Sequence, residues 1–169
     1  EEIKVLSQYQ LLKTSFEIGD YHRAIDEATA LLREFPESDY VDEALYEMGW
    51  AHYNLGQHRE AVLAFERLSE RSSADYRIDR AQFQIGRSYY EQQLYPQVRE
   101  ALGALIQRYD FSHLTEAERI NMEAQKLSGV VKETALELVA KAELLIGDSY
   151  SAEGRVDDAA VAYRRVIAN

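Results

Sequence analysis

The chain has 169 residues, of which 46% are hydrophobic and 29% charged, a balance typical of a globular protein rather than a disordered one. Its formal net charge of −11 argues against nucleic acid or an anionic membrane as the main partner, because both need a concentrated positive surface. The absence of cysteine excludes disulfides, thiolate catalysis and cysteine-ligated metals.

Apolar residues recur with the period of an α-helix along almost the whole chain, and short turns separate the periodic segments. The predicted helices span residues 2–18, 21–34, 40–55, 58–71, 76–92, 95–109, 115–128, 131–152 and 156–168. Pro36 follows the end of one helix and Pro96 lies in the first turn of another, which are positions that tolerate proline. No apolar run is long enough to predict a transmembrane helix.

The chain contains an internal repeat. Gly49, Gly86 and Gly147 occupy matching positions, and Leu12 takes that position in a degenerate first copy. The steps from Leu12 to Gly49 and from Gly49 to Gly86 are 37 residues each, whereas the step from Gly86 to Gly147 is 61. The spacing predicts three regular helical hairpins, an insertion over 111–133 and a fourth hairpin.

The second helix of each hairpin follows a repeated turn. The turn positions are Gly19, Gly56, Gln93 and Gly154, and the matching positions later in the second helix are Ala28, Phe65, Leu102 and Tyr163. A helix that ends at Gly56 is expected to close with a left-handed residue, a conformation that glycine adopts without steric cost. Small residues in the first helix allow the two helices to approach closely.

The order of Leu/Met/Ile, Gly and Tyr, then Gly-x-x-x-x-Ala and an aromatic residue, resembles the tetratricopeptide repeat. The resemblance implies an all-α fold, a right-handed α-solenoid of about four helix-turn-helix repeats with one helical insertion. It implies three repeats over 1–110, the insertion over 111–133 and a fourth repeat over 134–169. The tryptophan that usually opens the first helix is absent, and Gln8, Leu45, Gln82 and Glu143 stand in its place.

One segment carries a narrower resemblance. From Phe35 to Gly49 the pattern Phe-Pro-Glu-Ser-x-Tyr-x-x-Glu-Ala-Leu-Tyr-x-x-Gly looks like the linker of bacterial envelope tetratricopeptide proteins. These include the Tol–Pal coordinator and the lipoprotein of the outer-membrane assembly machinery. The resemblance implies the periplasm or cell envelope of a bacterium, and a cytoplasmic location is the alternative. Because the chain begins at Glu1 without Met, we expect it to be a fragment of a longer protein.

No pattern in the sequence predicts an enzyme, a cofactor or a metal. None of the four histidines lies in a His-Glu-x-x-His pattern, and there is no Gly-x-Ser-x-Gly turn. His52 is expected to pack between helices, and His22 and His58 are expected in solvent. The acidic residues over 37–43 lack the spacing of a calcium loop.

The resemblance implies instead that alternate turns of the first helices line a concave groove for a partner. The predicted partner-binding residues are Tyr9, Tyr46, Trp50, Tyr53, Phe83, Arg87 and Tyr90. Tyrosine, tryptophan and arginine are the residue types that dominate binding energy at interfaces. The position of Trp50 holds Lys13, Arg87 and Asp148 in the other repeats, and three charged residues are not expected in a core position.

The sequence therefore predicts a non-enzymatic scaffold that binds a protein or peptide segment in an aromatic groove. The alternative is self-assembly, because the apolar face of the last helix (Ala159, Val166, Ile167) lacks a helix to cover it. Two roles remain open for the insertion over 111–133, an extra helix on the edge of the array or a partner-specific lid.

Overall fold

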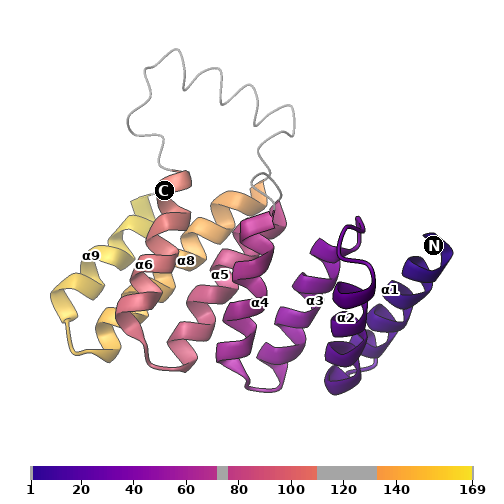
Figure 1. Cartoon of the computed structure of the whole chain (residues 1–169). Helices are drawn as coiled ribbons and strands as arrows, with labels where there is room; N and C mark the ends of the chain where they lie inside the picture. Colours follow the sequence, from indigo (N-terminus) through magenta and orange to yellow (C-terminus); the bar gives the residue numbers. More distant parts are fainter. Residues whose placement is uncertain (1, 72–75, 110–132, 169) are drawn as a thin grey trace, which may run out of the picture. The chain divides into compact units, whose positions relative to one another are not determined.

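The computed structural model describes residues 2–71, 76–109 and 133–168, and all regular structure in this part of the chain is α-helical (Figure 1). The prediction of an all-α chain of helix-turn-helix repeats is confirmed. The predicted helix over 115–128 lies outside the described residues. The chain forms two compact units, Glu1–Gln92 and Gln93–Asn169.

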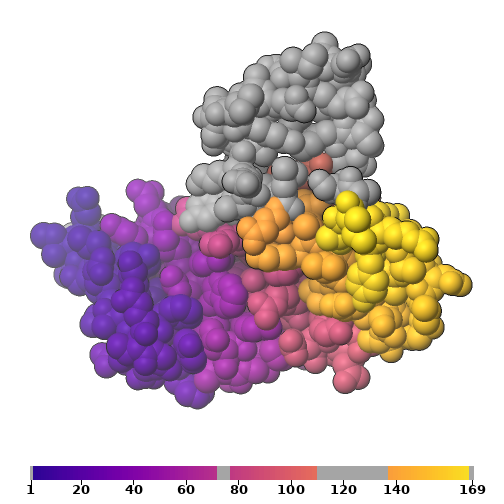
Figure 2. All heavy atoms as spheres, turned by 180° about the vertical axis from the view of Figure 1, so that it is seen from behind, coloured from indigo at the N-terminus to yellow at the C-terminus, as the bar shows by residue number. Residues whose placement is uncertain are grey.

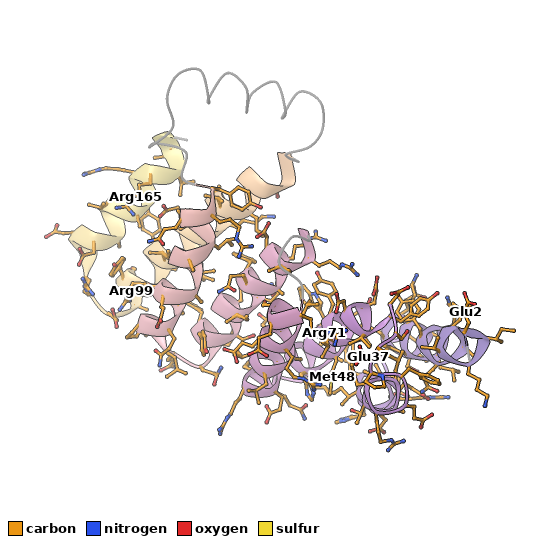
Figure 3. The ribbon with its side chains drawn as sticks, turned by 45° about the horizontal axis from the view of Figure 1, so that its top comes forward. Glu2, Glu37, Met48, Arg71, Arg99 and Arg165 are labelled. Atoms are coloured by element: carbon orange, nitrogen blue, oxygen red, sulfur yellow. The ribbon has the colours of Figure 1, made fainter. Side chains whose placement is uncertain are left out.

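The first unit contains five helices. They are α1 (Glu2–Glu17), α2 (Tyr21–Glu34), α3 (Val41–Asn54), α4 (His58–Arg71) and α5 (Tyr76–Glu91). Each helix packs on the next in the chain, and α3 also packs on both α1 and α5, the first helices of the neighbouring hairpins (Figure 1). Arg71 at the end of α4, labelled in Figure 3, pairs with Asp42 at the start of α3 at 3.0 Å.

The second unit contains the described helices α6 (Tyr95–Arg108), α8 (Glu133–Ala152) and α9 (Val156–Ala168). α6 packs on α8, and α8 packs on α9. Figure 2 shows the surface of these helices on the face opposite to that of Figure 1. Ala159, which the sequence analysis assigned to the open face of α9, is buried. The hairpin of α8 and α9 therefore repeats the packing of the hairpins in the first unit.

The two helices of a hairpin touch where a small residue meets a large one. A Cβ atom on Gly49 would lie 2.6 Å from the Phe65 ring, and one on Gly147 would collide with the Tyr163 ring. In the first hairpin the two matching positions hold the large Leu12 and the small Ala28, and both are fully buried. These two positions therefore keep the combined volume of one small and one large side chain, and the glycine itself is not required.

A left-handed residue ends the first helix at each turn of the repeat. Gly19, Gly56 and Gly154 have φ of 79°, 72° and 75°, and Gln93 takes the same position with φ of 59°. After α3, the Gly56 N–H donates to the Tyr53 carbonyl at 3.0 Å, and the next N–H donates to the His52 carbonyl at 2.9 Å. This pair of bonds satisfies carbonyls that the helix leaves free.

We expect Gln93→Gly to stabilise the protein by about 0.5–1 kcal/mol, because the left-handed conformation costs every side chain except glycine. The opposite change, Gly56→Ala, meets open space but strains the backbone, so it should cost about 1 kcal/mol. Urea denaturation of the two variants measures both effects. A loss of stability in Gln93→Gly would contradict the assignment of this turn to the repeat.

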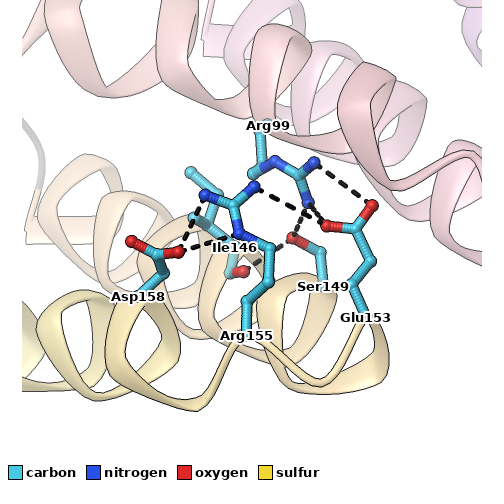
Figure 4. A network of polar contacts seen from close by, with 6 residues as sticks. All are labelled: Arg99, Ile146, Ser149, Glu153, Arg155 and Asp158. Carbon is cyan, nitrogen blue, oxygen red and sulfur yellow. Dashed lines mark hydrogen bonds and ion pairs between the residues drawn. The ribbon is translucent and has the colours of Figure 1, made fainter.

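Tyr150 of α8 contacts two arginines in the second unit. The Arg99 and Arg155 guanidinium carbons lie 4.6 and 4.5 Å from the centre of its ring. Arg99 also pairs with Glu153 at 2.8 Å and donates a hydrogen bond to the Ser149 hydroxyl at 3.3 Å (Figure 4). The position of Arg99 is apolar in the other repeats, so this arginine is held on the α6–α8 contact by charge and ring contacts instead of apolar packing.

Glu143 of α8 is only 3% exposed, and its Oε2 atom has no hydrogen-bond partner among the described residues. Its cationic neighbour is Arg165 of α9 at 3.9 Å, which is largely exposed. Burial therefore raises the pKa of the Glu143 carboxyl, and Arg165 opposes this rise only in part. The matching positions hold Gln8, Leu45 and Gln82, all uncharged.

We expect Glu143→Gln to stabilise the protein at pH 7 and to have little effect near pH 4. The pKa of Glu143 is higher in the folded state, so its stabilising contribution is present below the unfolded value and is lost as the pH rises through the folded value. The gain at neutral pH should be about 1.4 kcal/mol for each unit by which the pKa is raised. The exposed Glu100→Gln on α6 is the control. Equal effects of Glu143→Gln at both pH values would contradict this account.

Candidate functional site

The structure places all seven predicted binding residues in the first unit, on its three neighbouring first helices. Tyr9 lies on α1, whereas α3 carries Tyr46, Trp50 and Tyr53 and α5 carries Phe83, Arg87 and Tyr90. Each of the seven side chains is half-buried. We call these seven residues the first-helix face. Half-burial leaves part of the surface of each side chain for a partner.

Three rings form a ladder along α3. Tyr46, Trp50 and Tyr53 follow one another at helical spacing, and their ring centres are 6.4 and 5.8 Å apart in edge-to-face contact. The fully buried Phe65 of α4 lies beneath them, with its ring centre 6.0 Å from that of Tyr46 and 6.4 Å from that of Trp50. The ladder is thus supported from the core by the same ring that packs on Gly49.

Arg87 connects α5 to this ladder. Its guanidinium carbon lies 4.9 Å from the centre of the Tyr53 ring, and it donates a long hydrogen bond of 3.4 Å to the Gln84 side chain. The other half-buried arginines among the described residues, Arg77 and Arg99, each have a carboxylate partner. Arg87 has no carboxylate within 4.0 Å in the described part of the chain. A half-buried guanidinium that has no carboxylate partner is suited to bind a carboxylate of another molecule.

Tyr53 is held from two sides. Besides Arg87, the His58 ring of α4 lies 5.1 Å from it in edge contact. His58 was expected in solvent, and this expectation is wrong, because the residue is half-buried and its Nδ1 atom is fully covered. Burial raises the pKa of the Tyr53 hydroxyl, Arg87 lowers it, and Glu91 of α5 raises it further. The hydroxyl therefore stays protonated at neutral pH.

Tyr9 has a different neighbour from the α3 ladder. Its ring stacks on Tyr40, in the turn before α3, with the ring centres 4.9 Å apart. Burial, followed by Glu43 and Glu47, raises the pKa of the Tyr9 hydroxyl. Tyr40 and Glu47 belong to this end of the site, and the sequence analysis did not select them.

Glu47 lies three residues before Trp50 in α3 and is half-buried. Burial raises the pKa of its carboxyl, Lys13 of α1 lowers it, and Glu17 raises it. Glu47 could have been selected from the sequence, because it directly follows Tyr46. It lies on the side of α3 that is toward α1. The first-helix face thus has Glu47 toward α1, and Arg87 together with Glu91 toward α5.

The sequence matches the tetratricopeptide repeat family at residues 43–72, 80–112 and 141–169, which together make up more than half of the chain. These matches fall on the second, third and fourth predicted repeats, and the degenerate first hairpin is not matched. A search of curated protein sequences found no significant match.

Solved structures show a similar fold at low sequence identity. TPR-like repeats of a kinesin light chain from Podospora anserina are 16% identical, with a TM-score of 0.50 over 98% of this chain and 93% of that one. MamA is also 16% identical, with a TM-score of 0.49 over 93% of this chain and 92% of that one. Among the described residues, no helix is both long and apolar enough to cross a membrane.

Proposed function

Because the chain belongs to the tetratricopeptide repeat family, whose members generally bind other proteins, we propose that its first-helix face binds a segment of a partner protein. The family is typically non-enzymatic. The segment lies across α1, α3 and α5 and contacts the side chains of the face. In this role the chain is a scaffold that positions its partner.

The position of Trp50 carries the proposal. The residues at the same repeat position, Lys13 of α1 and Asp148 of α8, are exposed, so this position faces outward in its sister helices. Trp50 lies on the buried Phe65 and has Tyr46 and Tyr53 at its two edges. A supported aromatic ring that is open on one side is the usual centre of a binding surface.

Arg87 defines the second contact of the proposed segment. Because its guanidinium has no carboxylate partner among the described residues, an acidic side chain of the partner can bind it in bidentate geometry. The neighbouring Tyr53 ring holds the guanidinium in place before binding, which lowers the entropy cost of the contact. The proposed segment thus carries an apolar or aromatic residue at Trp50 and an acidic residue at Arg87.

Affinity capture with charge-reversal variants tests this function. The wild-type protein and Arg87→Glu are used to capture partners from extract of the source organism, and Arg59→Glu, an exposed arginine on α4, is the matched control. We expect wild type and Arg59→Glu to retain the same protein and Arg87→Glu to lose it. Equal recovery by all three proteins would contradict the proposed site.

We also propose a location in the periplasm or cell envelope of a bacterium. This proposal rests on the resemblance of the segment from Phe35 to Gly49 to bacterial envelope proteins. Fractionation of source cells, with an antibody against the protein, tests it. Recovery with the cytoplasmic proteins would contradict this location.

A further inference from the structure

Glu47 of α3 carries a carboxylate without a partner beside the first-helix face. The residue is half-buried, and among the described residues its side chain has no ion pair and no hydrogen bond. The nearby charges are already paired with one another. Glu17 of α1 lies 3.9 Å from Lys13, and Glu43, one turn earlier in α3, lies 2.5 Å from Arg77 of α5. Three carboxylates against two cations leave one negative charge in excess, and Glu47 carries it.

The environment of Glu47 makes this charge costly. Burial raises the pKa of its carboxyl, Lys13 lowers it and Glu17 raises it. Lys13 and Glu17 are both exposed, so water screens their effect on Glu47. A carboxylate that has lost water on burial recovers free energy when a cation contacts it. Glu47 is therefore suited to bind a cation of another molecule.

The surroundings of Glu47 favour a basic side chain over a metal ion. In the described part of the chain, no group of three or more acidic or histidine side chains is placed to hold a metal. Glu47 and Trp50 are three residues apart on α3, so their side chains are neighbours on the helix surface. A guanidinium bound to Glu47 would also lie beside an aromatic ring, as Arg87 does on Tyr53. Arginine therefore fits this position better than lysine.

The two unpaired charges lie on opposite sides of Trp50. Glu47 interacts with the charges of Lys13 and Glu17, so it lies on the side of α3 toward α1. Arg87 belongs to α5, on the other side of α3. A segment that crosses the face from α1 to α5 therefore meets a negative charge, an aromatic ring and a positive charge in that order.

We propose that the partner segment carries a basic residue that binds Glu47 and an acidic residue that binds Arg87, on opposite sides of the residue that contacts Trp50. This inference rests on the proposed function, because it adds a charge pattern to the segment that the first-helix face binds. The two charges fix the direction in which the segment lies across the helices.

The helix geometry gives the spacing of this pattern. Side chains three residues apart on a helix are about 5–6 Å apart, which an extended chain spans in about two residues. Neighbouring helices lie about 8–10 Å apart, which takes about three residues. An extended segment should therefore have its basic residue about two positions from the central residue, and its acidic residue about three positions away on the other side.

Selection from random twelve-residue peptides displayed on phage tests the proposal. The wild-type protein is the target, and the peptides kept are those that fail to bind Arg87→Glu. These peptides should share a central apolar or aromatic residue with a basic residue on one side and an acidic residue on the other. Fluorescence anisotropy of one synthetic peptide of this set then measures its affinity for each variant.

Replacements of Glu47 and of the basic peptide residue identify the contact. Glu47→Gln should weaken binding of the peptide about tenfold or more, because a charge-assisted contact is lost. Glu47→Lys should bind the peptide whose basic residue is changed to glutamate more tightly than the original peptide, which is the reverse of the wild-type preference. Glu66→Gln, at a half-buried glutamate of α4, is the matched control and should bind like wild type.

The outcomes separate this inference from the proposed function. Peptides that depend on Arg87 but bind wild type and Glu47→Lys equally would overturn the inference and leave the proposed function standing. So would a preference for the basic residue that Glu91→Gln removes and Glu47→Gln keeps, because the contact would then be with the exposed Glu91. A selection that yields no peptide dependent on Arg87 would count against the proposed function, and the inference would fall with it.

Discussion

Replacing Gly49 with leucine should unfold much of the first unit, with a loss of about 3 kcal/mol or more in the free energy of unfolding. The added Cβ alone would lie 2.6 Å from the Phe65 ring, and this ring is fully buried in a close-packed core. Even Gly49→Ala should be destabilising, although alanine is the better helix former. Urea denaturation followed by circular dichroism measures these losses.

A second substitution should recover part of this loss. Gly49→Leu combined with Phe65→Ala reproduces the large–small order of Leu12 and Ala28 in the first hairpin. The double variant should be more stable than the sum of the two single effects, with a coupling of about 1–3 kcal/mol. Gly103→Ala is the control, because its Cβ meets no atom within 4 Å, and it should gain up to about 1 kcal/mol. Additive effects in the double variant would contradict the size-pair explanation.

Replacing Trp50 with alanine should weaken partner binding by about 2 kcal/mol or more, which is roughly thirtyfold. The ring is half-buried on Phe65, so we expect a loss of stability of about 1–2 kcal/mol, below that of a fully buried aromatic residue. Calorimetric titration of the captured partner measures the first effect, and urea denaturation measures the second.

The matched control for this variant is Leu63→Ala, which removes an exposed apolar side chain from α4. It should leave the affinity unchanged. A stability loss of about 3–5 kcal/mol in Trp50→Ala would mean that the ring belongs to the core. Unchanged affinity in a folded Trp50→Ala protein would place the binding surface elsewhere.

The helices and their order could be predicted from the sequence because each signal recurs in the repeats. The helix predicted over 40–55 is found at Val41–Asn54, and the one predicted over 95–109 at Tyr95–Arg108. The turn residue and the helical period fix these bounds locally. The repeat spacing of 37 also predicted that Trp50 and Arg87 share one face, and the structure places both on neighbouring first helices of one unit.

The contacts between side chains could not be predicted in this way. A helical period gives the face on which a residue lies, but not the neighbour that its side chain selects. Tyr9 stacks on Tyr40 rather than on the α3 rings, and His58 packs on Tyr53 instead of lying in solvent. The Tyr9–Tyr40 contact depends on the position of the next hairpin, and the Tyr53–His58 contact depends on how the two helices of one hairpin pack. That the face binds a partner stays a prediction.

Intrinsic fluorescence tests the central claim most directly, because Trp50 is the only tryptophan in the chain. The wild-type protein is titrated with the captured partner or with a tryptophan-free peptide from it. If the partner segment covers the first-helix face, the emission of Trp50 should shift to shorter wavelength and become less accessible to acrylamide, and Arg87→Glu should weaken this response. Binding that leaves the emission and the quenching of Trp50 unchanged would contradict the proposed site.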